Sequence, residues 1–187
     1  MDCTIRVIPT ESLKKYYKPD EITPYCQHCP RYGLNWSCPP HSFSVTDTFT
    51  HFRLAYVIGV KVLLSGFTQK AESLDYYHKC RHAVNQRLLQ YEQAMPAALV
   101  LIAGHCDICD PCARQVSLAC NFPDQQRYSF ESLGFKVSEM MADIFDDKLQ
   151  WDKDKTPDNL YLVSGILSNS TIETDELRQI LTGQAVA

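Results

Sequence analysis

Residues 53–64 read RLAYVIGVKVLL, a run of β-branched, aliphatic and aromatic side chains that is interrupted by one lysine. Side chains of these types favour strands, and a nearly continuous apolar run of this length is typical of a buried strand. Ser65 and Gly66 follow the run and end it. We therefore predict a buried strand here, and the rest of the fold is worked out from it.

The segment that follows predicts a helix and then a second buried strand. Thr68 is a suitable N-cap, and apolar side chains recur at spacings of three and four up to about Gln93. The predicted packing face consists of Tyr77, Cys80, Val84, Leu88 and Tyr91. Pro96 closes the helix, and residues 97–103 (AALVLIA) form the second strand, which ends at Gly104.

Further elements are predicted on both sides of this unit. We expect a short strand at Thr4–Pro9, an irregular loop at Tyr16–Pro30, a helix capped by Ser138, a third main strand at Tyr161–Leu167 and a terminal helix at Thr174–Leu181. No repeat or linker divides the chain. The sequence therefore predicts one α+β domain over residues 1–187, with a small mixed sheet packed by helices. Ferredoxin-like and doubly wound topologies both fit this pattern.

The composition excludes several classes of protein. The chain has 187 residues, of which 45% are hydrophobic and 21% charged, as in ordinary globular domains. Its formal net charge of -4 argues against binding to nucleic acid or anionic lipid. The start at Met1 lacks the features of a signal peptide, and the apolar stretch at residues 97–103 is far shorter than the roughly 20 residues that span a bilayer. We therefore expect a cytoplasmic protein that does not enter a membrane.

Nine cysteines in a chain without an export signal favour metal ligation over disulfide bonds, because a reducing compartment keeps them as thiols. Two of them, Cys3 and Cys80, fit buried core positions. The other seven form two cysteine-rich loops. We name these the first cysteine group (Cys26, Cys29 and Cys38) and the second cysteine group (Cys106, Cys109, Cys112 and Cys120).

The second cysteine group has the spacing C-x2-C-x2-C-x7-C, which resembles the ligand run of bacterial ferredoxins. Three closely spaced thiolates can each bind a separate iron of a compact cluster. A single zinc ion is the alternative, although most four-cysteine zinc sites use two separated pairs. The spacing therefore favours a 4Fe-4S cluster over zinc.

The first cysteine group supplies only three thiolates, so its fourth ligand is open. The side-chain candidates are Cys80, Cys3, His28 and His41, and the remaining candidate is an exogenous molecule on an open iron. A dithiol redox pair of Cys26 and Cys29 is a further alternative, but it leaves Cys38 without a role.

Other residues near the cysteines have candidate supporting roles. Arg31, Arg114 and Arg127 could offset the negative charge of a cluster or hold an anionic substrate. His105 could donate a hydrogen bond to cluster sulfur and tune its potential. The aromatic side chains that we expect to shield the centres from water are Tyr32, Trp36 and Tyr128.

Both cysteine groups lie within longer sequence patterns. Residues 26–40 fit C-x2-C-x2-Y-G-x2-W-x-C-P-P, and residues 104–112 fit G-x-C-x2-C-x2-C, with a later C-x2-P at residues 120–123 and S-x-E-x2-G at residues 129–134. In these patterns the chain resembles an uncharacterised family of predicted metal-binding proteins of bacteria and archaea. The resemblance implies metal binding, with iron–sulfur clusters as the expected cofactor, and no particular reaction. Glu131 occupies the acidic position of the last pattern, where it could orient a ligand or act as an acid or base. We prefer a third role, the stabilisation of a helix start.

Three functions are compatible with these residues. The first is a carrier with two iron–sulfur clusters that exchanges electrons with a redox partner protein. The second is an enzyme in which an open iron at the first cysteine group acts on a small anionic or sulfur-containing substrate. The third is a zinc-stabilised interaction module without redox chemistry. The substrate, the partner and the oligomeric state are not determined by the sequence.

Overall fold

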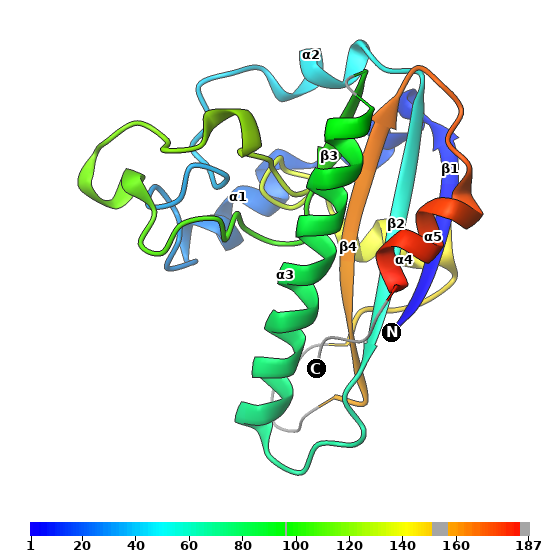
Figure 1. Cartoon of the computed structure of the whole chain (residues 1–187). Coiled ribbons are helices and arrows are strands. Elements are labelled where there is room, and N and C mark those ends of the chain that lie inside the picture. Colours follow the sequence, from blue (N-terminus) through cyan, green and yellow to red (C-terminus); the bar gives the residue numbers. More distant parts are fainter. Residues whose placement is uncertain (96, 151–156, 184–187) are drawn as a thin grey trace.

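The predicted strand at residues 53–64 is β2 (Leu54–Leu63), which lies in the interior of a four-stranded sheet. The computed structural model, shown in Figure 1, describes residues 1–95, 97–150 and 157–183. The other strands are β1 (Asp2–Pro9), β3 (Ala98–Leu101) and β4 (Asn159–Ser168), and their order in the sheet is β1-β2-β4-β3. The strands predicted from the sequence at Thr4–Pro9, residues 97–103 and Tyr161–Leu167 are therefore confirmed, with shifts of a few residues at their ends.

All three strand pairings in the described residues are antiparallel, so the expectation of a mixed sheet was wrong. The reason is the position of β4. The helix α3 (Lys70–Ala94) connects β2 to β3, but β4 lies between these two strands and pairs with both. Strands that run in the same direction are thereby separated by one that runs in the opposite direction.

This topology distinguishes between the two folds that the sequence left open. Starting from β2, the strands and the two helices on the first face of the sheet follow the order β2-α3-β3-β4-α5, where α5 is Thr174–Thr182. The segment between β3 and β4 carries η2 (Ala113–Val116), η3 (Pro123–Gln125) and α4 (Val137–Phe145), and β1 completes the sheet beside β2. The arrangement is a ferredoxin-like β-α-β-β-α-β motif whose last strand has moved to the N-terminus of the chain. A doubly wound fold needs a mainly parallel sheet and is excluded.

Each face of the sheet carries its own hydrophobic core, which explains the nearly continuous apolar run of β2. Because side chains alternate along a strand, Tyr56 and Ile58 point to one face while Ala55 and Val57 point to the other. On the first face, α3 and α5 cover the sheet. The second face is covered by the 3₁₀ helix η1 (Thr10–Tyr16), α2 (Val45–Thr50), α4 (Val137–Phe145) and residues 128–135.

The predicted loop at Tyr16–Pro30 was wrong in part, because it contains the helix α1 (Pro19–Gln27). None of its residues is buried, so it shows no apolar periodicity. Its signals are Pro19 at the start and two acidic residues in the first turn, which favour a helix N-terminus. The predicted caps Thr68 and Ser138 were also displaced, since α3 begins after Gln69 and α4 after Lys136.

The two cysteine-bearing segments lie side by side and project from the sheet next to α3 (Figure 1). We name them together the cysteine lobe, defined as residues 26–40 and 104–128. Two short 3₁₀ helices lie in the second segment, η2 (Ala113–Val116) and η3 (Pro123–Gln125). Within the described residues, the helices all lack the combination of length and apolar character that crossing a membrane requires.

Candidate functional site

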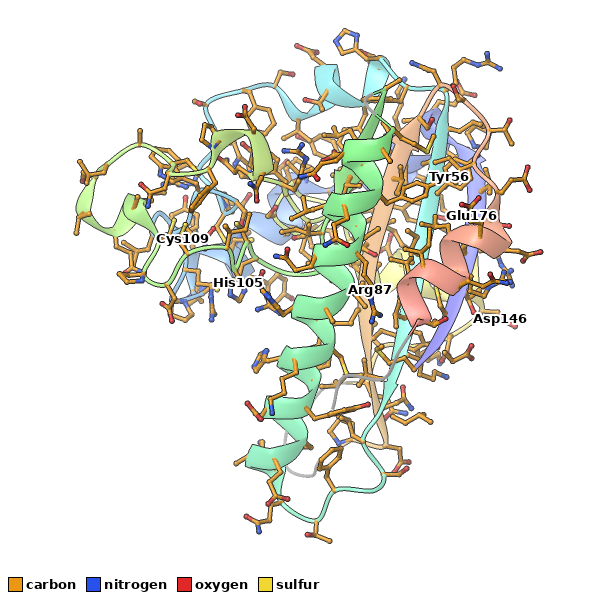
Figure 2. All side chains as sticks on the ribbon, viewed as in Figure 1. Tyr56, Arg87, His105, Cys109, Asp146 and Glu176 are labelled. Atoms are coloured by element: carbon orange, nitrogen blue, oxygen red, sulfur yellow. The ribbon has the colours of Figure 1, made fainter. Side chains whose placement is uncertain are left out.

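The cysteine lobe is attached to the domain core where β3 ends. The side chain of Asn85 on α3 donates to the carbonyl oxygen of Ala103 (3.2 Å) and accepts from its N–H (2.9 Å). The next residue, Gly104, has a φ of +69°, and a Cβ there would lie 3.2 Å from Nη1 of Arg81. Glycine is therefore needed both for the backbone conformation and for the close approach of Arg81. Figure 2 shows the labelled Cys109 and His105 in this lobe, on the side opposite Glu176 of α5.

The first cysteine group lines a cavity of about 260 Å³, which we name the first cavity. Its wall combines the end of α1, the loop that follows, the end of the β3 strand region and the turn before α4. The remaining lining residues are Arg31, Tyr32, Pro39, Gly104, His105, Ser129, Glu131 and Ser132.

The second cysteine group lines a separate, much smaller cavity of about 10 Å³, which we name the second cavity. Its other lining residues are Asn35, Trp36, Ile108, Phe122 and Gln126. The structure thus sorts the seven predicted ligands into the two sets that their spacing in the sequence defined. All nine cysteines are free thiols. No three His, Cys, Asp or Glu side chains of the described residues stand in an arrangement that holds a single metal ion.

A buried hydrogen-bond network joins the two cavities. Ser37 is fully buried, and its hydroxyl donates to Oδ1 of Asn35 (2.8 Å) and accepts from the N–H of Cys106 (2.8 Å). The same hydroxyl lies 4.0 Å from Sγ of Cys38. Asn35 also donates through Nδ2 to the carbonyl oxygen of Cys106 (3.0 Å). One serine therefore touches a thiol of the first cysteine group and the backbone of the second.

Arg114 locks the two segments of the lobe together. Its guanidinium donates to the carbonyl oxygens of Asn35 (2.9 Å), Cys38 (2.7 Å) and Pro40 (2.9 Å), and it lies 4.8 Å from the centre of the Trp36 ring. All of these partners belong to the first segment, whereas Arg114 belongs to the second. Its donors are committed to holding the backbone around Cys38.

The guanidinium of Arg127 is also bound to the protein. It forms a bidentate ion pair with Glu92 of α3, at N···O distances of 2.6 to 2.8 Å, and both side chains are largely buried. Glu92 also accepts a hydrogen bond from the N–H of Val100 in β3 (2.7 Å). Of the three arginines that the sequence singled out, Arg31 is the one that lines a cysteine cavity.

None of the four predicted side-chain candidates for a fourth ligand lines the first cavity. Cys3 and Cys80 are buried in the core between the sheet and the helices α3 and α5. His28 Nδ1 lies 2.7 Å from the carbonyl oxygen of Pro24, and His41 Nε2 lies 2.8 Å from that of Ser132. Both histidines thus contact backbone oxygen atoms.

His105 and Glu131 line the first cavity instead. His105 precedes Cys106 in the chain, so the sequence associated it with the second cysteine group, but the two neighbours face different cavities. Glu131 is distant in sequence from every cysteine of the first cysteine group. The S-x-E-x2-G pattern was its only signal in the sequence.

Arg81 of α3 controls the environment of His105, and sequence reasoning missed it. Its Nη1 donates to the carbonyl oxygen (3.0 Å) and lies 3.1 Å from Nδ1 of His105, while Nη2 pairs with Asp107 (3.3 Å). Burial and the charge of Arg81 lower the pKa of His105 to about 3. The imidazole is therefore neutral at pH 7, and its Nδ1 accepts from Arg81.

Burial also shifts the acidic groups of both cavities. It raises the pKa of Cys26 and Cys38 in the first cavity and that of Cys106, to about 11, in the second. The surrounding protein likewise raises the pKa of Glu131, although this side chain keeps access to solvent. Since thiolates are the form that binds metal, a metal that enters these cavities must displace protons from the cysteines.

Comparison with known proteins adds one relationship to this geometry. Searches of curated proteins and of solved structures give no significant match to the chain. A family described as "Predicted metal-binding protein (DUF2284)" matches residues 10–167, a range that contains both cysteine groups and three of the four strands. The chain therefore belongs to the DUF2284 family of predicted metal-binding proteins.

Proposed function

We propose that this protein binds two iron–sulfur clusters and is a redox enzyme. In this proposal the second cysteine group ligates one cluster completely, and the first cysteine group ligates another that keeps one iron open to a small substrate. The observation that carries the proposal is the division of the seven cysteines between two separate cavities, one lined by three thiols and the other by four.

The chemistry of the donors fits this assignment. Each cavity offers thiols that are free of disulfide bonds, and thiolate sulfur is the usual protein ligand of iron–sulfur clusters. The second cavity is small, and the side chains of Trp36, Ile108 and Phe122 line it beside the four thiols, which are partly buried. Four thiols in such surroundings suit a centre that only transfers electrons.

The first cavity suits a centre with an open coordination position. It has more room than the second, and the four side chains that the sequence put forward as its fourth ligand do not line it. His105 does line it, but its Nδ1 accepts a hydrogen bond from Arg81. Polar groups that are not cysteines line it as well, including Arg31 and Glu131. This favours the enzyme over a carrier with two completely ligated clusters.

The clusters would supply one-electron transfer and, at the open iron, Lewis acidity. The residues of the chain have three tasks in this scheme. Arg114 holds the two segments of the cysteine lobe in register, and Ser37 and Asn35 fix the backbone between the two cavities. Trp36 and Phe122 place aromatic surface beside the thiols of the second cavity. A redox partner protein would deliver electrons to the second cysteine group.

Anaerobic purification followed by iron and sulfide analysis tests the proposal directly. We expect a coloured protein with iron and acid-labile sulfide at two centres, and an electron paramagnetic resonance signal on reduction. A colourless, oxygen-insensitive protein with about two zinc ions would select the zinc-stabilised module instead.

Matched cysteine variants assign the centres to the two cavities. Cys109→Ala should remove the signal of the second centre and leave that of the first. Cys26→Ala should do the reverse. Cys3→Ala is the control, because Cys3 is buried in the core away from both cavities, and it should retain both centres. Loss of both centres in Cys3→Ala contradicts the ligand assignment.

A further inference from the structure

Some polar side chains of the first cavity form hydrogen bonds or ion pairs with the rest of the protein, and others do not. Apart from the cysteines, the cavity is lined by six side chains that can form hydrogen bonds, namely Arg31, Tyr32, His105, Ser129, Glu131 and Ser132. His105 is held by Arg81. Ser129 and Ser132 bind each other's backbone N–H groups, and Glu131 bonds to Ser129. These four side chains therefore already have partners within the protein.

Arg31 and Tyr32 are different. Within residues 1–95, 97–150 and 157–183, neither the guanidinium of Arg31 nor the hydroxyl of Tyr32 makes a hydrogen bond or an ion pair. The neighbouring arginines Arg81, Arg114 and Arg127 are all committed to protein acceptors. Arg31, which is exposed, and Tyr32, which is partly buried, thus stand next to each other in the chain and line the same cavity as the first cysteine group, with their side-chain donors available to a ligand.

The chemistry of these two donors is complementary to an anion. Arginine presents a planar fork that binds carboxylate or other oxyanions through two parallel N–H donors, and a tyrosine hydroxyl can add a third donor. The carboxyl group of Glu131 forms no ion pair with Arg31, so the positive charge is not cancelled within the cavity wall. The sequence places both donors two and three residues after Cys29, beside the thiols.

We propose that Arg31 and Tyr32 bind the anionic group of a small substrate, either a carboxylate or an oxyanion of sulfur or phosphorus, beside the first cysteine group. The inference rests on the proposed function, since it names the class of substrate for the same cavity. The competing role for Arg31 is to offset the negative charge of a bound cluster, and the two roles predict different measurements.

The test is isothermal titration calorimetry with the anaerobically purified protein, whatever metal it holds. The probes are acetate, sulfite and phosphate, with acetamide as the neutral counterpart of acetate. We expect at least one anion to bind and acetamide not to bind. Arg31→Gln should lower the affinity for the anion by about 10-fold or more, and Tyr32→Phe should lower it by roughly 3-fold, because each variant removes hydrogen-bond donors to the ligand. Arg31→Lys keeps the charge but loses the fork, so its affinity should be intermediate.

Tyr25→Phe is the matched control, since Tyr25 is 77% exposed and does not line the cavity, and its affinity should equal that of the wild type. The inference is wrong if no anion binds the wild type, or if Arg31→Gln and Tyr32→Phe bind the anion as tightly as the wild type does. It is also wrong if Arg31→Gln changes only the reduction potential, which is the signature of charge compensation. Should Arg31→Gln fail to fold, Arg31→Lys and Tyr32→Phe still decide the question. Iron and sulfide contents of each variant report separately on the proposed function.

Discussion

At the scale of single residues, the cysteine lobe depends on small groups that carry no chemistry of their own. Ser37 is the clearest example. Its hydroxyl group donates to Asn35, accepts from the N–H of Cys106 and lies close to Sγ of Cys38. Gly104 is another, since it alone allows the chain to turn past Arg81 at the end of β3. Both positions can be tested by replacing one residue.

Ser37→Ala should lower the free energy of unfolding by about 1–3 kcal/mol, because it leaves the partly buried N–H of Cys106 without its acceptor. It should also broaden the spectroscopic signals of the two proposed metal centres, since the backbone between them loosens. The exposed Ser138 is the control, and Ser138→Ala should change stability by less than about 0.5 kcal/mol. Urea denaturation measures both variants. Equal stability of the two variants contradicts the role of Ser37.

Replacing glycines by alanine at three positions separates the cost of a strained backbone from the cost of a close contact with a neighbouring side chain. Gly66 has no positive φ and open space around it, Gly33 has a φ of +69° and open space, and Gly104 has the same φ with Arg81 nearby. Alanine should therefore be tolerated at Gly66, cost about 1–2 kcal/mol at Gly33 and cost more at Gly104. The measurement is the urea midpoint of the three variants, and a different order rejects this explanation.

At the scale of elements, polar links fasten the helices and loops to the sheet. The segment after α4 is fixed by Asp147, which accepts from Nζ of Lys61 in β2 (3.0 Å) and from the hydroxyl of Tyr161 in β4. These hydrogen bonds hold the pKa of Asp147 at about 2, below its usual value. The link therefore joins α4 to two central strands at once.

The stability difference between the wild type and Asp147→Asn should depend on pH. The folded-state pKa lies below the unfolded value of about 3.9, so the stabilisation is complete above pH 5 and is lost as the pH falls toward 2. We expect the stability difference between wild type and variant to be constant from pH 8 to 5 and to shrink below pH 4. Urea denaturation at each pH measures it. A difference that grows on acidification contradicts this account.

At the scale of the whole molecule, the two hydrophobic cores lie on the sheet, whereas the cysteine lobe projects beside it (Figure 1). The lobe is held by polar contacts, chiefly those of Arg114, Arg127 and the Asn35 and Ser37 network. If the lobe binds metal as proposed, we expect its stability to depend on that metal more than the stability of the sheet does.

Removal of metal with a chelator under reducing conditions should accordingly loosen only part of the molecule. Amide hydrogen exchange should accelerate in residues 26–40 and 104–122, while β2 and β4 remain protected by the cores on either side. Mass spectrometry of hydrogen exchange in the metal-loaded and metal-free protein measures this. Uniform acceleration across the sheet would show that metal stabilises the whole fold instead.

The sequence by itself determined the features that depend on local spacing. The apolar run of residues 53–64 predicted a buried strand, and the cysteine spacings defined the two groups that the structure sorts into two cavities. These predictions succeed because strand burial and short ligand loops are properties of neighbouring residues. The exposed helix α1 was missed because it buries nothing and so carries no periodic pattern.

Only the tertiary structure decided what distant segments bring together. It inserted β4 between β2 and β3, which made the sheet antiparallel, and it placed His105 and Glu131 in the first cavity. It also removed Cys3 and Cys80 from the site by burying them in the core. The physical reason is that each of these outcomes depends on packing between elements far apart in the chain, which residue type and spacing do not encode.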